Sequence, residues 1–210
     1  MKIFNGVISE KISNLDYEFS GDINELNLPT PKNSTKGVYY NQNEISQNCC
    51  TVTACLGAFT DLTGYVFSLE ERKNLWEEAK KQGASDSYGW YVSDAVNLVR
   101  KYVNTLGIGN FVTVRTTFGS DVFYKAIKQG YSAVGIYKGN KLYNDDIADD
   151  GIVEETNLTG NSTYSHCIRY VWHSGVEVRD NYKGSKTWKN EYKIQHELEL
   201  YKNSVISPTV

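Results

Sequence analysis

The residue types that carry thiol and imidazole chemistry are scarce in this chain. Its 210 residues include only three histidines and four cysteines, and any site built on an imidazole or a thiol must draw on them. They are His166, His173, His196, Cys49, Cys50, Cys55 and Cys167. Three of the cysteines are crowded into residues 49–55, whereas secreted disulfide scaffolds space their cysteines along the whole domain. We therefore expect free thiols in a reducing compartment.

Two further absences exclude classes of partner. Lys and Arg number 22 against 25 Asp and Glu, a net charge of −3, so the positive surface of a nucleic-acid-binding protein is missing. The sequence has no apolar run of the roughly 18 residues that a membrane span needs, and its first residues turn polar before a signal peptide could form. We expect no nucleic-acid or membrane partner and a cytoplasmic location.

Proline is rare as well, with three residues, while 22% of the chain is charged and 13% aromatic. This composition is typical of a folded domain and not of a disordered chain. A chain of this length buries enough apolar surface to fold without a metal or a disulfide framework.

The periodicity of apolar residues predicts helices in the first two-thirds of the chain. A stripe with helical spacing runs through residues 50–63 and stops at Gly64, which favours a mostly buried helix. Ser68 and Glu71 have the spacing of a capping box and open a second helix that extends to about residue 82. Further helices are expected to begin at 93–94 and at 120–121. Residues 1–36 show no period and are expected to form an extended arm.

The later part of the chain is rich in β-branched and aromatic residues. Antiparallel strands are predicted for residues 131–137, 166–173, 176–181 and 191–201, with a tight turn at 174–175 and a long acidic connection at 138–165. Helices followed by strands indicate an α+β fold of two lobes, one helical and one built on a sheet, with a groove where they meet.

One group of residues could carry chemistry. Cys50 stands at the first turn of the predicted buried helix, where free backbone N–H groups and the helix dipole favour a thiolate. An imidazolium beside it would strengthen that effect, and His166 is the candidate. The predicted hairpin 166–181 returns Asn181 toward His166, where its side chain could accept a hydrogen bond from the other ring nitrogen.

These residues resemble the papain-like cysteine peptidases, over about residues 28–194. Residues 40–54 read YNQNEISQNCCTVTA, similar to a bacterial variant of the family's segment around its nucleophile. The resemblance implies Cys50 as nucleophile and Gln42 as the amide of the oxyanion hole. The spacing of eight from Gln42 to Cys50 is longer than the usual family pattern, so Gln47 stays an alternative amide and Cys49 an alternative nucleophile.

The second half of the family pattern follows more than a hundred residues later. The segments of this chain that resemble it are SHCI at 165–168, VRDNYKG at 178–184, Trp188 and YKI at 192–194. The resemblance implies His166 as general base and Asn181 as the residue that orients it. Lys183 stands where the family has a tryptophan that shields the pair from water.

The resemblance also implies a papain-like two-lobe domain at residues 28–210, with a barrel-like sheet lobe and with residues 1–27 as an N-terminal arm. The activity it implies is cleavage of peptide bonds in a peptide or protein substrate through an acyl-enzyme. Two alternatives remain open: a papain-fold binding or structural protein without activity, and a transamidase or deamidase using the same thiol. Oligomeric state and substrate specificity are not predicted.

The remaining cysteines and histidines have simpler interpretations. A zinc site is disfavoured because adjacent cysteines cannot readily occupy two corners of a tetrahedron and no C-x2-C pair occurs, so no metal and no cofactor are expected. Cys55 and Cys167 are expected to pack in the core, and His173 and His196 to have surface or structural roles.

Overall fold

The computed structural model describes residues 17–19, 38–108, 110–117, 132–139, 164–172, 176–179, 181, 187–189 and 202–209. The helices are the short 3-10 helix η2 (Gln42–Glu44), α1 (Cys50–Thr63), α2 (Leu69–Lys81) and α3 (Val92–Thr105). The strands are β1 (Tyr17–Phe19), β2 (Asn110–Thr117), β3 (Ser132–Gly139), β4 (Tyr164–Trp172), β5 (Val176–Arg179), β6 (Thr187–Lys189) and β7 (Lys202–Thr209). None of the helices in these ranges is long and apolar enough to cross a membrane.

The strands form one sheet in the order β1-β2-β7-β3-β4-β5-β6. Every neighbouring pair is antiparallel except β1 and β2, which are parallel. Helices packed against a mainly antiparallel sheet make this an α+β fold, as the sequence predicted. Over the described residues the sheet is open, with β1 and β6 at its edges, so the barrel-like closure that the resemblance implied is not seen. The division into two lobes stays a prediction.

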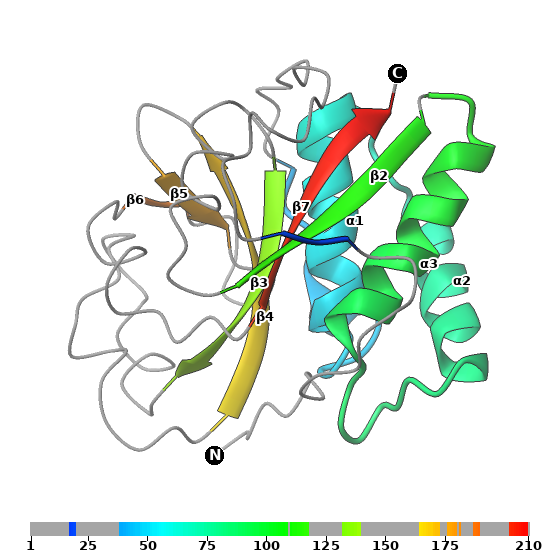
Figure 1. Ribbon diagram of the computed structural model, residues 1–210. Helices are drawn as coiled ribbons and strands as arrows, with labels where there is room; N and C mark the ends of the chain where they lie inside the picture. Colours follow the sequence, from blue (N-terminus) through cyan, green and yellow to red (C-terminus); the bar gives the residue numbers. More distant parts are fainter. Residues whose placement is uncertain are drawn as a thin grey trace.

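Helix α1 lies at the centre of the fold. It spans the residues predicted for it and ends at Gly64, whose φ of 74° is the left-handed conformation that favours glycine at this position. Every residue from Cys50 to Leu62 is buried, because α1 packs against α3 on one side and against β3 and β4 on another. Figure 1 shows α1, α2 and α3 gathered on one side of the sheet.

Helix α2 is capped as predicted. Ser68 Oγ accepts a hydrogen bond from the Glu71 backbone N–H at 3.2 Å, and the Glu71 carboxylate accepts one from the Ser68 N–H at 2.8 Å. Helix α3 differs from its prediction, since its N-cap is Tyr91 and no side chain caps it. Ser93 is buried inside the first turn, because the α3 face that packs on α1 begins there.

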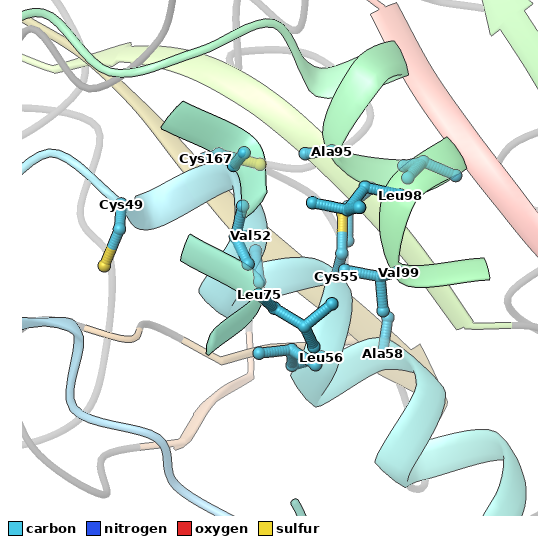
Figure 2. Close-up of a cluster of buried hydrophobic side chains, with 14 of the residues drawn as sticks. Cys49, Val52, Cys55, Leu56, Ala58, Leu75, Ala95, Leu98, Val99 and Cys167 are labelled. Atoms are coloured by element: carbon cyan, nitrogen blue, oxygen red, sulfur yellow. The ribbon is translucent and has the colours of Figure 1, made fainter. Parts of the chain in front are cut away.

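The thiols of the core lie where the sequence placed them. Neither Cys55 nor Cys167 forms a disulfide, and both are fully buried in the cluster of apolar side chains that joins α1, α3 and the sheet, so their prediction as core residues is confirmed. Figure 2 shows Cys55 drawn among the side chains of Leu98 and Val99 from α3. The thiols therefore act here as small hydrophobic groups.

Several predicted elements differ from the structure or fall outside it. Strands β3, β4 and β5 confirm three predicted strands, with ends shifted by one or two residues. Strands β2, β6 and β7 were not predicted. The helix expected from 120, the turn at 174–175, the strand expected at 191–201 and the acidic connection lie wholly or largely outside the described residues. Of the expected N-terminal arm, the structure describes β1, which pairs with β2.

Candidate active site

Cys50 is the first residue of α1 and is 1% exposed. The N-cap residue before it, Cys49, places no side-chain hydrogen bond on the helix N-terminus, and the first turn carries no acidic residue. The backbone N–H groups of this turn and the positive end of the helix dipole therefore favour an anion at Cys50. This position suits a nucleophilic thiolate.

Cys49 has a different environment from its neighbour. Its Sγ is 3.1 Å from the Ser46 carbonyl oxygen and 3.5 Å from that of Gln42, both of which accept from the thiol, and it lies 3.4 Å from Thr53 Oγ1. Burial raises the pKa of Cys49 to about 12. Figure 2 shows its sulfur directed away from the side chains of Val52 and Cys55. Cys49 is thus a protonated hydrogen-bond donor near neutral pH, which favours Cys50 as the nucleophile.

Gln42 begins the short helix η2 and is fully buried. Its side-chain Nε2 donates to the Gln47 carbonyl oxygen at 2.6 Å, and its backbone N–H donates to the Asn181 carbonyl oxygen at 2.9 Å. In the turn that follows, the backbone N–H groups of Ile45 and Ser46 donate hydrogen bonds to the Gln42 carbonyl oxygen. This turn lies between Gln42 and Cys50. The side chain of Gln47 is exposed, which favours Gln42 as the oxyanion amide.

Asn181 joins two of the predicted site residues. It follows β5 by two positions and is fully buried. Its Nδ2 donates to Gln42 Oε1 at 2.7 Å and to the Cys50 carbonyl oxygen at 3.2 Å. Residues 42, 50 and 181, which are far apart along the chain, therefore meet at the N-terminus of α1. Within the part of the chain that the structure describes, Asn181 Oδ1 is buried without a hydrogen-bond partner.

His166 lies in β4 and is 3% exposed. Arg169 of β4 pairs with Arg179 of β5, two residues before Asn181 in the sequence. Burial, with the Cys50 and Cys55 thiols nearby, raises the pKa of the Cys167 thiol. Helix α1 packs against β4, so Cys50 and His166 lie on adjacent elements. Contact of His166 itself with Cys50 or Asn181 stays a prediction.

Comparisons with known proteins address the fold around this site. Neither the protein-family models nor the curated proteins gave a match. Among solved structures, the chain is similar to proCathepsin B S9 from Trypanosoma congolense, with a TM-score of 0.63 at 11% identity, covering 98% of this chain and 86% of that one. The fold is papain-like. Xylellain, a cysteine protease from Xylella fastidiosa, is similar with a TM-score of 0.61 at 14% identity, covering 98% of this chain and 96% of that one.

In this papain-like fold, two arginines that the sequence did not mark as functional lie on the strands that carry His166 and precede Asn181. Arg169 and Arg179 are buried or nearly so on β4 and β5, and both bond to Asp61 of α1. The available signal was a charged residue at an inward position of an otherwise apolar strand, as in the HCIRYVW run at 166–172. Over the described residues, no three His, Cys, Asp or Glu side chains are grouped to hold a metal ion.

Proposed function

We propose that this chain is a cysteine peptidase. Cys50 is its nucleophile, His166 its general base and acid, Asn181 the residue that orients His166, and Gln42 the side chain of its oxyanion hole. The observation that carries the proposal is the position of Asn181 Nδ2, which bonds to Gln42 Oε1 at 2.7 Å and to the Cys50 carbonyl at 3.2 Å. Its setting is a fold similar to solved cysteine proteases.

The proposed chemistry begins with attack by the Cys50 thiolate on the carbonyl carbon of the scissile peptide bond, which forms a C–S bond. The negative charge that moves to the carbonyl oxygen is stabilised by the Cys50 backbone N–H and by the amide of Gln42. One N–H of Gln42 Nε2 donates a hydrogen bond to the Gln47 carbonyl oxygen. The second N–H donates to the oxyanion of the substrate. Gln42 is held at both ends of its amide, so it needs little reorganisation during reaction.

Proton transfer belongs to His166. As the C–N bond breaks, the imidazolium gives its proton to the leaving amine. A water molecule then attacks the acyl carbon while His166 takes its proton, and the C–S bond breaks to release the carboxylic acid and the Cys50 thiolate. Asn181 Oδ1 is the acceptor that would hold the second ring N–H and fix the tautomer and orientation of the imidazole.

A papain-fold binding protein without turnover is the second candidate. The observation that favours it is the low exposure of the whole group, with Cys50 at 1% and His166 at 3%. A transamidase or deamidase would use the same thiol and differ only in what attacks the acyl-enzyme, so analysis of the products separates it from a peptidase.

The test combines turnover with thiol labelling. We expect the wild type to cleave a library of fluorogenic peptides and to be alkylated by iodoacetamide at Cys50 at mildly acidic pH, where an ordinary thiol is protonated. Cys50→Ala should lower turnover by at least about a thousandfold, and His166→Ala should abolish the acidic labelling. The matched control is Cys49→Ser, which keeps a donor to the Ser46 carbonyl and should retain both signals.

The candidates give different outcomes. If the wild type is labelled at Cys49 and not at Cys50, or if the Cys49→Ser variant is no longer labelled, Cys49 is the nucleophile. Slow and equal labelling of all four cysteines without cleavage would favour the binding protein. Cleavage by Cys50→Ala would contradict the peptidase proposal.

A further inference from the structure

Three charged side chains are buried between α1 and the sheet. Asp61 of α1 accepts from Arg169 Nε at 2.9 Å through one carboxylate oxygen and from Arg179 Nη1 at 2.6 Å through the other. The side chains are 4%, 2% and 12% exposed, respectively. We call these residues the ion triad. It joins α1, β4 and β5 through a single carboxylate.

Arg169 is enclosed by further contacts. Its Nη2 donates to the Val38 carbonyl oxygen at 2.5 Å. Its guanidinium crosses α1 at Gly57, where an added Cβ would lie 2.6 Å from Cζ of Arg169. Glycine is therefore needed for the arginine to pass this close to the helix backbone. An arginine held from three sides has little freedom to shift along the helix.

Stability alone does not explain a buried ion group of this kind. Removing ions from water is costly, and replacing such a group by apolar side chains of similar volume is often neutral or stabilising. Charge-assisted hydrogen bonds, in contrast, are directional and specify one relative position of the groups they join. An apolar contact would allow α1 to slide against β4 by part of a residue.

Each member of the ion triad lies on an element that also carries a residue of the proposed site. Asp61 shares α1 with Cys50, Arg169 shares β4 with His166, and Arg179 lies two residues before Asn181. A small displacement of β4 or β5 along α1 would therefore move His166 and Asn181 relative to Cys50. Misplacement by about 1 Å can lower a rate by about a hundredfold.

We propose that the Asp61–Arg169–Arg179 triad positions the β4–β5 pair on α1 and so sets the geometry between Cys50, His166 and Asn181. This inference rests on the proposed peptidase function for its catalytic consequence. The three residues are positioning residues, because they act through the elements they join and need no contact with substrate.

The first test exchanges Arg179, the most exposed member. Arg179→Met leaves Asp61 paired with Arg169 and should fold, but it releases β5 from the carboxylate. We expect kcat to fall by about tenfold or more with KM within about twofold, because positioning is lost and substrate binding is not. Arg179→Lys keeps a cation within reach of Asp61 Oδ1 and should restore kcat to within about threefold of wild type.

A matched control separates positioning from general destabilisation. Glu71→Gln removes the charge from a hydrogen-bonded cluster on α2, away from β4 and β5, and should leave kcat unchanged when measured well below its melting temperature. If Glu71→Gln lowers kcat as much as Arg179→Met, or if Arg179→Met keeps wild-type kcat, the positioning role is wrong.

A second variant replaces the whole triad with apolar side chains. Asp61→Leu combined with Arg169→Met and Arg179→Met leaves no unpaired buried charge, so the fold should be retained. We expect a melting temperature near that of wild type and a kcat lowered by tenfold or more. Wild-type kcat in this folded variant would show that the triad contributes packing alone.

A spectroscopic measurement tests the positioning even if the chain cleaves no peptide. The side-chain NH2 signals of Asn181, assigned by comparison with Asn181→Ala, report its bonds to Gln42 and to the Cys50 carbonyl. Their hydrogen exchange should speed up at least tenfold in Arg179→Met and stay slow in Arg179→Lys. Absence of Cys50-dependent turnover in the wild type would contradict the peptidase proposal, and unchanged exchange in Arg179→Met would contradict the positioning.

Discussion

At the scale of single residues, neighbours in the sequence have unlike environments. The Cys49 thiol donates a hydrogen bond to backbone carbonyl oxygens, and burial raises its pKa to about 12. Cys50 lies one residue further, at the N-terminus of α1. The difference arises because the chain enters the helix between them, so the two side chains point into different surroundings. The sequence predicted Cys50 as the nucleophile and left Cys49 as an alternative, because helix periodicity places both residues at the start of the same helix.

The carboxylate of Glu71 lies in a cluster of hydrogen-bond donors that lowers its pKa. Partial burial raises the pKa of Glu71, but hydrogen bonds from Tyr65, Ser68 and Tyr102 outweigh it and hold the pKa at about 2. The folded-state pKa is below the usual 4.5, so the stabilisation is complete above that pH. It is lost as the pH falls from about 4.5 through about 2.

The corresponding prediction concerns Glu71→Gln. We expect it to lower the free energy of unfolding at neutral pH by about 1 kcal/mol, since partial exposure screens the charge and glutamine still completes the capping box. The difference from wild type should shrink steadily below pH 4.5 in urea unfolding curves recorded across pH. A difference that stays constant down to pH 2 would contradict the assigned hydrogen bonds.

At the scale of elements, prediction from sequence succeeded where the signals are local. Helix α1 matches its prediction at both ends because its apolar stripe and Gly64 lie within the helix or next to it. The capping box of α2 is also contained within four residues. Strands β2 and β7 were missed because what stabilises them is their pairing with each other, over a separation of more than eighty residues. The start of α3 was misplaced because burial of Ser93, a tertiary effect, overrides its tendency to cap a helix.

Gly57 provides a test of how closely α1 meets the sheet. Gly57→Ala would improve the intrinsic helix propensity of α1 by about 1 kcal/mol. We nevertheless expect it to destabilise the protein by about 2 kcal/mol or more, because the added methyl group overlaps Arg169 inside a packed core. Thermal unfolding measures the outcome. A stabilised Gly57→Ala variant would mean that Arg169 does not cross the helix at this point. The control is Gly83→Ala on the surface, whose added Cβ has open space but whose φ of 107° makes the change mildly destabilising.

At the scale of the whole molecule, the role of the N-terminal arm, residues 1–27, depends on tertiary contacts, because its sequence has no helical or strand periodicity. Residues 17–19 form β1, an edge strand that pairs in parallel with β2. We therefore expect the arm to fasten the sheet at its edge. Deleting residues 1–27 should lower the free energy of unfolding, because β2 loses the backbone hydrogen bonds on one side.

Activity distinguishes this role from coverage of the groove. For the deletion variant we expect kcat/KM for a short peptide within about twofold of wild type at a temperature where both are folded. A large gain in kcat/KM would instead mean that the arm restricts access to the site. The control is a variant in which the order of residues 1–16 is scrambled and β1 is kept. Its free energy of unfolding should equal that of wild type.

The amino-acid sequence by itself determined the α+β class, the central helix from Cys50 to Thr63, the capping of α2 and a short set of residues from which a thiol site could be built. Those features depend on periodicity, caps and residue type, which act over a few residues. Only the tertiary structure decided that Asn181 meets Gln42 and Cys50, that Cys49 is a hydrogen-bonded thiol, and that Asp61 joins two arginines on separate strands. The contacts of Asn181 and of Asp61 join residues more than a hundred positions apart, and their geometry is set by how the sheet packs on α1.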